Sequence, residues 1–256
     1  MRNTQKQLKD TIIDNINVID KQEINNTKIA TAAQDSINDR PEINKEEITN
    51  DDLNNIILPE DIKSDSPDYM LYSPFPVGYS NIQEQSYIFE NLIVGYTPDL
   101  SILDIGCGRA DLINFIEYYH GTRPSLYTGI DHNPNILNIA KQKYGTDFKL
   151  TFGPFEKLDL VIHDWVVASG IFTARRCESE SEDLLKLIDD IDILYKATNQ
   201  VLAFNLLNPI NTTHFEGFFY VHPGLILDML IEKYQDVVIK HNYSDDVYTV
   251  LIYKYI

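Results

Sequence analysis

The fold of this chain is decided by ten residues, Ile102-Leu103-Asp104-Ile105-Gly106-Cys107-Gly108-Arg109-Ala110-Asp111. An apolar run that is typical of a buried strand ends in an acid, and a glycine-rich turn follows at once. Further along, residues 127–131 repeat the pattern of a strand that ends in an acid. Two such strands around a glycine turn predict the first half of a nucleoside-binding, Rossmann-like unit.

The glycines and the second acid indicate what this unit binds. Gly106 and Gly108 are expected where the backbone turns sharply and lies close to a ligand, because a Cβ would obstruct both. Asp131 ends the second strand, where it is expected to accept hydrogen bonds from a ribose diol. The third glycine position of a dinucleotide-binding G-x-G-x-x-G frame holds Asp111, whose carboxylate would meet a pyrophosphate. The motif therefore favours a cofactor with a ribose and no phosphates, which points to S-adenosylmethionine.

Three motifs in order resemble those of the class I S-adenosylmethionine-dependent methyltransferases. Residues 103–108 match motif I, residues 129–133 match the ribose-acid motif, and residues 164–172 match the motif of the fourth strand. The resemblance covers residues 79–256. It implies a Rossmann-like, doubly wound α/β fold with a seven-stranded sheet, mostly parallel, that ends in an antiparallel C-terminal hairpin strand.

The resemblance also implies which residues bind S-adenosylmethionine. Many members of the family place an acid after the third strand to bind the adenine amino group. Here that acid, Glu156, is offset, so Phe155 is the expected contact of the adenine ring. The expected cofactor-binding residues are Asp104, Gly106, Cys107, Gly108, Asp131, His132, Phe155, Ser169 and Gly170.

Hydrophobic periodicity outside these motifs agrees with such a fold. Helices are predicted at residues 83–95, 112–119, 135–144, 182–198 and 225–234. Further strands are predicted at residues 148–152, 165–172, 201–207, 237–239 and 247–255, with a hairpin turn at 242–246. Strands that alternate with helices predict a parallel, doubly wound sheet.

The beginning of the chain has a different composition from the rest. No aromatic residue occurs before Tyr69 and no glycine before Gly78. We therefore predict a polar extension over residues 1–67, partly disordered or weakly helical, and a methyltransferase-like domain over residues 68–256. Isoleucines near the start fall on one helical face, so a short helix that binds a protein partner is the alternative to a flexible tail.

Charge and composition narrow the partners and the location. The formal net charge is −18, whereas a protein that grips a nucleic-acid backbone normally presents a basic face. No apolar stretch approaches the ~20 residues that span a bilayer, and the first residues do not resemble a signal peptide. Two cysteines make no disulfide framework. We expect no nucleic-acid substrate, no membrane, and a cytoplasmic location, or a virion if the chain comes from a phage.

The catalytic residues are less clear than the cofactor site. We predict an acceptor pocket between the fourth and fifth strands, bounded by residues 169–170, by Asn205 and by an aromatic loop at residues 214–222. His214 in this loop is the candidate general base. No spaced cluster of His, Cys and carboxylate residues indicates a metal.

The most favoured function is methyl transfer from S-adenosylmethionine to a small molecule, a glycan or a protein. The alternative is a non-catalytic structural or interaction protein, such as a phage component, that keeps the fold and is tethered through its N-terminal extension. A nicotinamide oxidoreductase is disfavoured by Asp111.

The predicted domain boundary can be tested by truncation. A variant that begins at Ser66 should stay folded and bind S-adenosylmethionine as tightly as the full chain, because the removed segment lacks the large side chains that build a core. Circular dichroism and calorimetry measure both properties. Unfolding or aggregation of the shortened chain would place residues 1–67 in the core.

Overall fold

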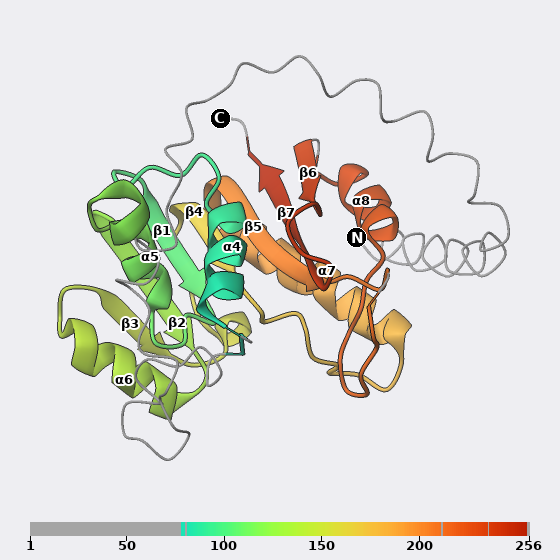
Figure 1. Ribbon diagram of the computed structural model, residues 1–256, viewed down its shortest axis with the longest axis horizontal. Helices are drawn as coiled ribbons and strands as arrows, with labels where there is room; N and C mark the ends of the chain where they lie inside the picture. The colour runs from blue at the N-terminus through green and yellow to red at the C-terminus, as the bar shows by residue number, and fades with distance from the viewer. Residues whose placement is uncertain (1–77, 80, 211, 235, 255–256) are drawn as a thin grey trace, which may run out of the picture. The chain divides into compact units, whose positions relative to one another are not determined.

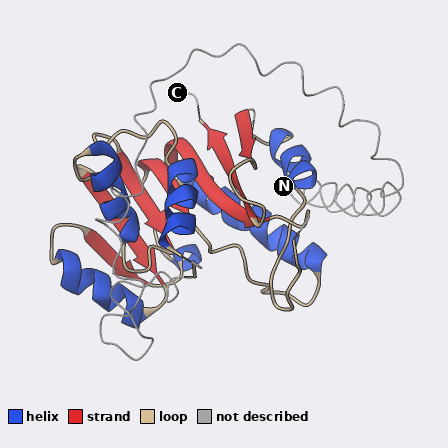
Figure 2. Cartoon of the chain, viewed as in Figure 1, coloured by secondary structure: helices blue, strands red, loops and turns tan. Residues whose placement is uncertain are grey.

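The computed structural model describes residues 78–79, 81–210, 212–234 and 236–254, which all belong to the unit formed by residues 61–256. They form one seven-stranded sheet with helices packed against it (Figures 1 and 2). The predicted boundary at residue 68 and the predicted N-terminal helix lie outside the described residues.

The sheet has the predicted architecture. Its order is β3-β2-β1-β4-β5-β7-β6; β1 to β5 run parallel, and β7 is antiparallel to both β5 and β6. The predicted seven-stranded sheet with an antiparallel hairpin strand is therefore confirmed. The strands are β1 (Ser101–Ile105), β2 (Leu126–Asp131), β3 (Lys149–Phe152), β4 (His163–Ala168), β5 (Thr198–Leu207), β6 (Asp236–Lys240) and β7 (Val247–Tyr253).

Helices connect the strands, and their ends follow local capping rules. Asn133 caps α6 ahead of Pro134 at its first position, and Ser179 and Glu182 form a capping box on α7. In Figure 1, α4 lies in front of the sheet and α7 behind it. None of the helices within the described ranges is long and apolar enough to cross a membrane. The helices are α4 (Ile82–Leu92), α5 (Asp111–His120), α6 (Pro134–Tyr144), the 3₁₀ turn η3 (Phe155–Lys157), α7 (Glu180–Lys196) and α8 (Pro223–Ile231).

The central strands form the core and fix α4 upon it. Val166 in β4 and Leu202 in β5 have no exposed surface, as expected for parallel strands covered on both faces. Trp165 of β4 donates its indole N–H to the carbonyl of Leu92 at 3.0 Å and packs edge-on against Tyr96. Because α4 is held against β4 in this way, its first turn has a defined place beside the carboxyl edge of the sheet.

The end of β4 differs from the prediction. The apolar run predicts a strand through Phe172, but β4 ends at Ala168. Gly170 takes a φ of +73°, which only glycine adopts readily, and its N–H donates to the side chain of Asn205 instead of a neighbouring strand. The chain turns there, and Ile171 is directed back against Gly106. The apolar residues after Ala168 therefore belong to a loop: Ile171 packs against Gly106, and Phe172 is buried with its ring edge-on to Phe204 of β5.

Gly129 of β2 provides a test of packing at the centre of this fold. A Cβ at Gly129 would lie 2.8 Å from Cys107 Sγ and 2.9 Å from Leu150 Cδ2. Gly129→Ala should therefore lower the free energy of unfolding by about 1–3 kcal/mol through overpacking. Urea denaturation measures the change. Cys107→Ala combined with Gly129→Ala should cost less than the sum of the two single changes, and strict additivity would contradict the proposed clash.

Candidate functional site

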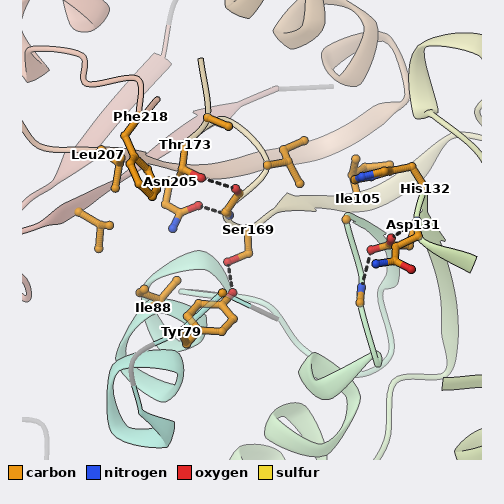
Figure 3. A pocket seen from close by; sticks show the side chains of 18 of the residues that line it. Tyr79, Ile88, Ile105, Asp131, His132, Ser169, Thr173, Asn205, Leu207 and Phe218 are labelled. Atoms are coloured by element: carbon orange, nitrogen blue, oxygen red, sulfur yellow. Dashed lines mark hydrogen bonds between the residues drawn. The ribbon is translucent and has the colours of Figure 1, made fainter. Parts of the chain in front are cut away.

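A cavity of about 850 Å³ opens at the carboxyl edge of the parallel strands. Residues from the ends of β1, β2, β4 and β5 line it, together with the turn before α4 and the turn before β7. Figure 3 shows Asp131 and His132 at one end, Asn205, Leu207 and Phe218 at the other, and Ser169 between them. This is the edge where open α/β sheets bind ligands.

The glycine turn after β1 forms the floor of one half of the cavity. The carbonyl of Ile130 accepts hydrogen bonds from the N–H groups of Gly106 at 2.8 Å and Cys107 at 3.0 Å. Gly106 has a φ of +74°, and a Cβ there would lie 2.2 Å from Ile171 Cγ2. A side chain at this position is therefore excluded by backbone conformation and by packing. Gly108, with a φ of 53°, lines the cavity beside it.

The Asp131 side chain binds the glycine turn and also faces the cavity. Its Oδ2 accepts from the N–H of Gly108 at 2.8 Å, and its Oδ1 accepts from the N–H of Asn133 at 2.7 Å. The residue is 8% exposed and lines the cavity. Each carboxylate oxygen can accept a further hydrogen bond, so Asp131 can hold a diol while it holds the turn.

Asp104 occupies a different position from the other predicted cofactor residues. Its side chain is buried, does not line the cavity, and accepts a hydrogen bond of 2.6 Å from the Tyr127 hydroxyl. Burial and, to a smaller extent, the negative charges of Asp131 and Asp111 raise the pKa of Asp104 to about 7, against the lowering effect of the hydrogen bond from Tyr127. Asp104 is therefore a buried residue of the fold that does not face the cavity.

The remaining cofactor candidates divide in the same way. Cys107 packs against Gly129 and is not a lining residue, and burial raises the pKa of its thiol well above its usual range. His132, which directly follows β2, and Phe155, which begins η3 after β3, both line the cavity. Ser169 and Gly170 line its middle.

A polar group of four residues lies where the two halves of the cavity meet. The Tyr79 hydroxyl is 2.6 Å from Ser169 Oγ. The next residue, Gly170, donates its N–H to Asn205 Oδ1 at 2.7 Å. Burial raises the pKa of Tyr79 above its usual range, so its hydroxyl keeps its proton at neutral pH. These groups can donate and accept hydrogen bonds at the centre of the cavity.

The aromatic loop after β5 forms the far wall, but His214 does not. Phe215, Phe218 and Tyr220 line the cavity. His214 is exposed, stacks on Tyr220 with ring centroids 4.3 Å apart, and has its Nε2 3.0 Å from the carbonyl of Pro209. The structure thus brings Asn205 and the aromatic side chains together, as predicted, and leaves the candidate general base outside.

The loop between β4 and α7 is fixed by buried carboxylates of α7. Asp183, which is 1% exposed, accepts from the backbone N–H groups of Arg176 and Cys177, and Asp190, with no exposed surface, accepts from the Arg176 guanidinium at 2.6 Å. Backbone hydrogen bonds from Arg175 to Gly217 and from Phe219 to Thr173 join this loop to the aromatic loop. The cavity wall is therefore built before any ligand binds.

Several lining residues were not predicted from the sequence. Glu84 and Ile88 come from α4, and Asp246 and Val247 come from the hairpin between β6 and β7. The register of β5 with β7 could have indicated Asp246 and Val247, since Val247 pairs with Leu207 at the end of β5. Tyr79, in the segment before α4, also lines the cavity.

The adjacent His163 and Asp164 of β4 are potential metal ligands by residue type, but both have other partners. His163 Nε2 lies 2.9 Å from Thr128 Oγ1 and its Nδ1 lies 2.8 Å from the carbonyl of Val161. Asp164 accepts from the backbone N–H of Ser101, and from Asn199. Within the described part of the chain no three His, Cys, Asp or Glu side chains are grouped so that they could hold a metal ion.

Comparisons with known proteins agree with this architecture. No protein-family model matches the chain. A Mycobacterium tuberculosis protein named "Putative methyltransferase Rv1506c" is 27% identical over 165 residues, which make up 63% of this chain and 98% of that protein.

Two solved structures share the fold. One is magnesium protoporphyrin IX methyltransferase from Synechocystis PCC 6803 with bound SAH, with a TM-score of 0.50 and 14% identity over 73% of this chain and 97% of that chain. The other is a "putative O-methyltransferase" from Nostoc punctiforme PCC 73102, with a TM-score of 0.51 and 11% identity over 66% of this chain and 56% of that one. At these identities the likeness concerns the fold.

The buried Asp104 predicts a pH dependence of stability. Because its pKa is about 7 in the folded chain and near 4 when exposed, the folded state binds the proton more tightly. Stability should therefore fall as pH rises from about 4 to 7, by up to about 4 kcal/mol from this group. Asp104→Asn should remove this slope while its side-chain oxygen still accepts from Tyr127. Urea denaturation between pH 5 and 8 compares the two proteins; parallel curves would show that Asp104 is ionised throughout.

Proposed function

We propose that this chain, whose fold is that of the class I S-adenosylmethionine-dependent methyltransferases, transfers a methyl group from S-adenosylmethionine to a small-molecule, glycan or protein acceptor. One observation carries the proposal. A single cavity joins the glycine turn and Asp131 to Ser169, Asn205 and an aromatic wall. Cofactor and acceptor can therefore lie in contact within one cavity.

The cofactor half of the cavity suits a nucleoside without phosphates. In the proposal Asp131 accepts hydrogen bonds from the ribose diol, Gly106 and Gly108 let the backbone approach it, and Phe155 contacts the adenine. The position of His132 at the cavity wall fits a contact with the same nucleoside. Asp104 and Cys107 are given no direct contact with the cofactor in the proposal, because neither lines the cavity. The Synechocystis methyltransferase that shares the fold was solved with bound SAH, which supports this assignment.

The centre of the cavity suits the positioning that methyl transfer requires. When bound, S-adenosylmethionine supplies an electrophilic methyl group on a sulfonium, and the reaction is an in-line displacement in which the protein mainly aligns the nucleophile. Ser169, Tyr79 and Asn205 provide hydrogen-bonding groups for this alignment. His214 is not carried into the proposal, because it does not line the cavity and its Nε2 faces the carbonyl of Pro209.

The alternatives have less support in the site. A dinucleotide would bring its pyrophosphate to the first turn of α5, where Asp111 takes the place of the third glycine of the dinucleotide-binding frame. A purely structural protein has no need of a preformed cavity at this edge of the sheet. Methyl transfer from tritiated S-adenosylmethionine to fractionated metabolites, glycans and proteins separates an enzyme from a protein that only binds the cofactor.

We further propose where the protein acts and what else it contacts. Cys107 and Cys177 are both free, which supports a reducing compartment such as the cytoplasm. The net charge of −18 argues against a nucleic-acid substrate. Residues 1–67 are proposed to contact a protein partner, because their composition cannot build a core of its own.

The role of Asp131 can be measured directly. Asp131→Ala should weaken S-adenosylmethionine binding by one to two decades, since it removes charge-assisted hydrogen bonds worth on the order of 1.5–3 kcal/mol. Calorimetry measures the affinity, and urea denaturation checks that the turn held by Asp131 survives. Asp147→Ala, an exposed acid after α6 that does not line the cavity, is the matched control. Unchanged affinity of the Asp131 variant would remove this residue from the site.

A further inference from the structure

The half of the cavity beyond Ser169 has a chemical character that narrows the acceptor. We infer that the methyl acceptor is an arylalkylamine, with a flat aromatic body that packs on the aromatic loop and a protonated aliphatic amino group that lies at Asp246. This inference rests on the proposed function and adds the substrate class to it.

Asn205 indicates that a ligand belongs in this half. The residue is 2% exposed, and its Oδ1 is fixed because the N–H of Gly170 needs an acceptor. Its Nδ2 therefore points the other way, toward the cavity, as Figure 3 shows, and has no hydrogen-bond partner among the described residues. A donor held so rigidly in a mostly buried side chain calls for an oxygen lone pair on a bound molecule.

The aromatic wall favours a flat molecule. Phe215 is 63% exposed and Phe218 is 46% exposed, although both line the cavity. Their rings lie edge to face with centroids 6.4 Å apart. The backbone of this loop is joined to the loop after β4, so the rings form a wall rather than a loose cover. Exposed aromatic faces bind planar apolar groups and also attract cations.

The charges around this wall favour a cation. Asp246 lies one residue before Val247, which pairs with Leu207, and Leu207 in turn bridges to Tyr220 of the aromatic loop. Its Oδ1 accepts from the Thr212 hydroxyl, and among the described residues its Oδ2 has no partner. This leaves one carboxylate oxygen beside the aromatic wall for an ammonium group.

Among the described residues that line the cavity, no Lys or Arg is left to bind Asp246. The only Lys or Arg among the described lining residues is Arg176, whose guanidinium is bound to the buried Asp190. A carboxylate on the acceptor would therefore meet repulsion, and an amino group attraction.

Three probes of one shape test the inference. Tyramine, tyrosol and 3-(4-hydroxyphenyl)propionate share a phenol whose oxygen can accept from Asn205, and they differ in an ammonium, a hydroxyl or a carboxylate. Their affinities are measured by ligand-observed NMR on the full chain saturated with S-adenosylhomocysteine. Tyramine should bind about 3–10-fold more tightly than tyrosol, since one exposed ion pair and a cation–π contact are each modest. The propionate should bind most weakly.

Two neighbouring acids provide the variant and its control. Asp246→Asn should reduce the preference for tyramine to less than about twofold, while Asp245→Asn, one residue away and not at the cavity, should retain it. The inference is overturned if the propionate binds as tightly as tyramine, if the preference survives Asp246→Asn, or if no probe binds below 10 mM. Failure of S-adenosylhomocysteine itself to bind would instead contradict the proposed function, which keeps the two outcomes distinct.

Discussion

The contact between the glycine turn and the end of β2 is the constraint on which the rest of the structure depends. The Ile130 carbonyl accepts from the N–H groups of both Gly106 and Cys107, and the Asp131 carboxylate accepts from Gly108. These bonds draw the turn across the edge of the sheet until no side chain fits at Gly106, where Ile171 already lies. The hydrogen bonds to Ile130 and Asp131 therefore determine the shape of the turn and the orientation of the Asp131 carboxylate. They also bring Gly106 into contact with Ile171, in the loop that follows β4.

The electrostatics of the site follow from this close packing. Three carboxylates, those of Asp104, Asp111 and Asp131, lie near one turn, and only Asp131 faces the cavity. Asp111 is neutralised by Arg109, and burial raises the pKa of Asp104 to about 7 although the hydrogen bond from Tyr127 lowers it. A single negative charge is thus left for the diol of a ribose. At the other end, Asp246 has one carboxylate oxygen that no described residue binds, and this oxygen gives the acceptor half its negative charge.

The sequence was a good guide where a local pattern has one physical meaning. The motif of acid and glycines, the alternation of strands and helices, and the turn at residues 242–246 led to the sheet that is observed. Prediction failed where tertiary contacts decide. The apolar run after Ala168 predicts a longer strand, but Gly170 donates to Asn205, 35 residues away, and the strand ends. His214 and Tyr220 both lie in the aromatic loop and stack on each other, but only the folded structure shows that Tyr220 lines the cavity and His214 does not. Asp246 could be placed only through the register of β5 with β7.

The central claim is that the cavity binds S-adenosylmethionine with its ribose at Asp131 and its sulfur toward Ser169 and Asn205. A crystal structure of the full chain grown with S-adenosylhomocysteine tests this most directly. The account predicts both ribose hydroxyls within hydrogen-bond distance of the Asp131 carboxylate, the adenine against Phe155, and the sulfur facing the acceptor half. Crystals without the ligand at saturating concentration, or a ligand bound away from Asp131, would contradict it.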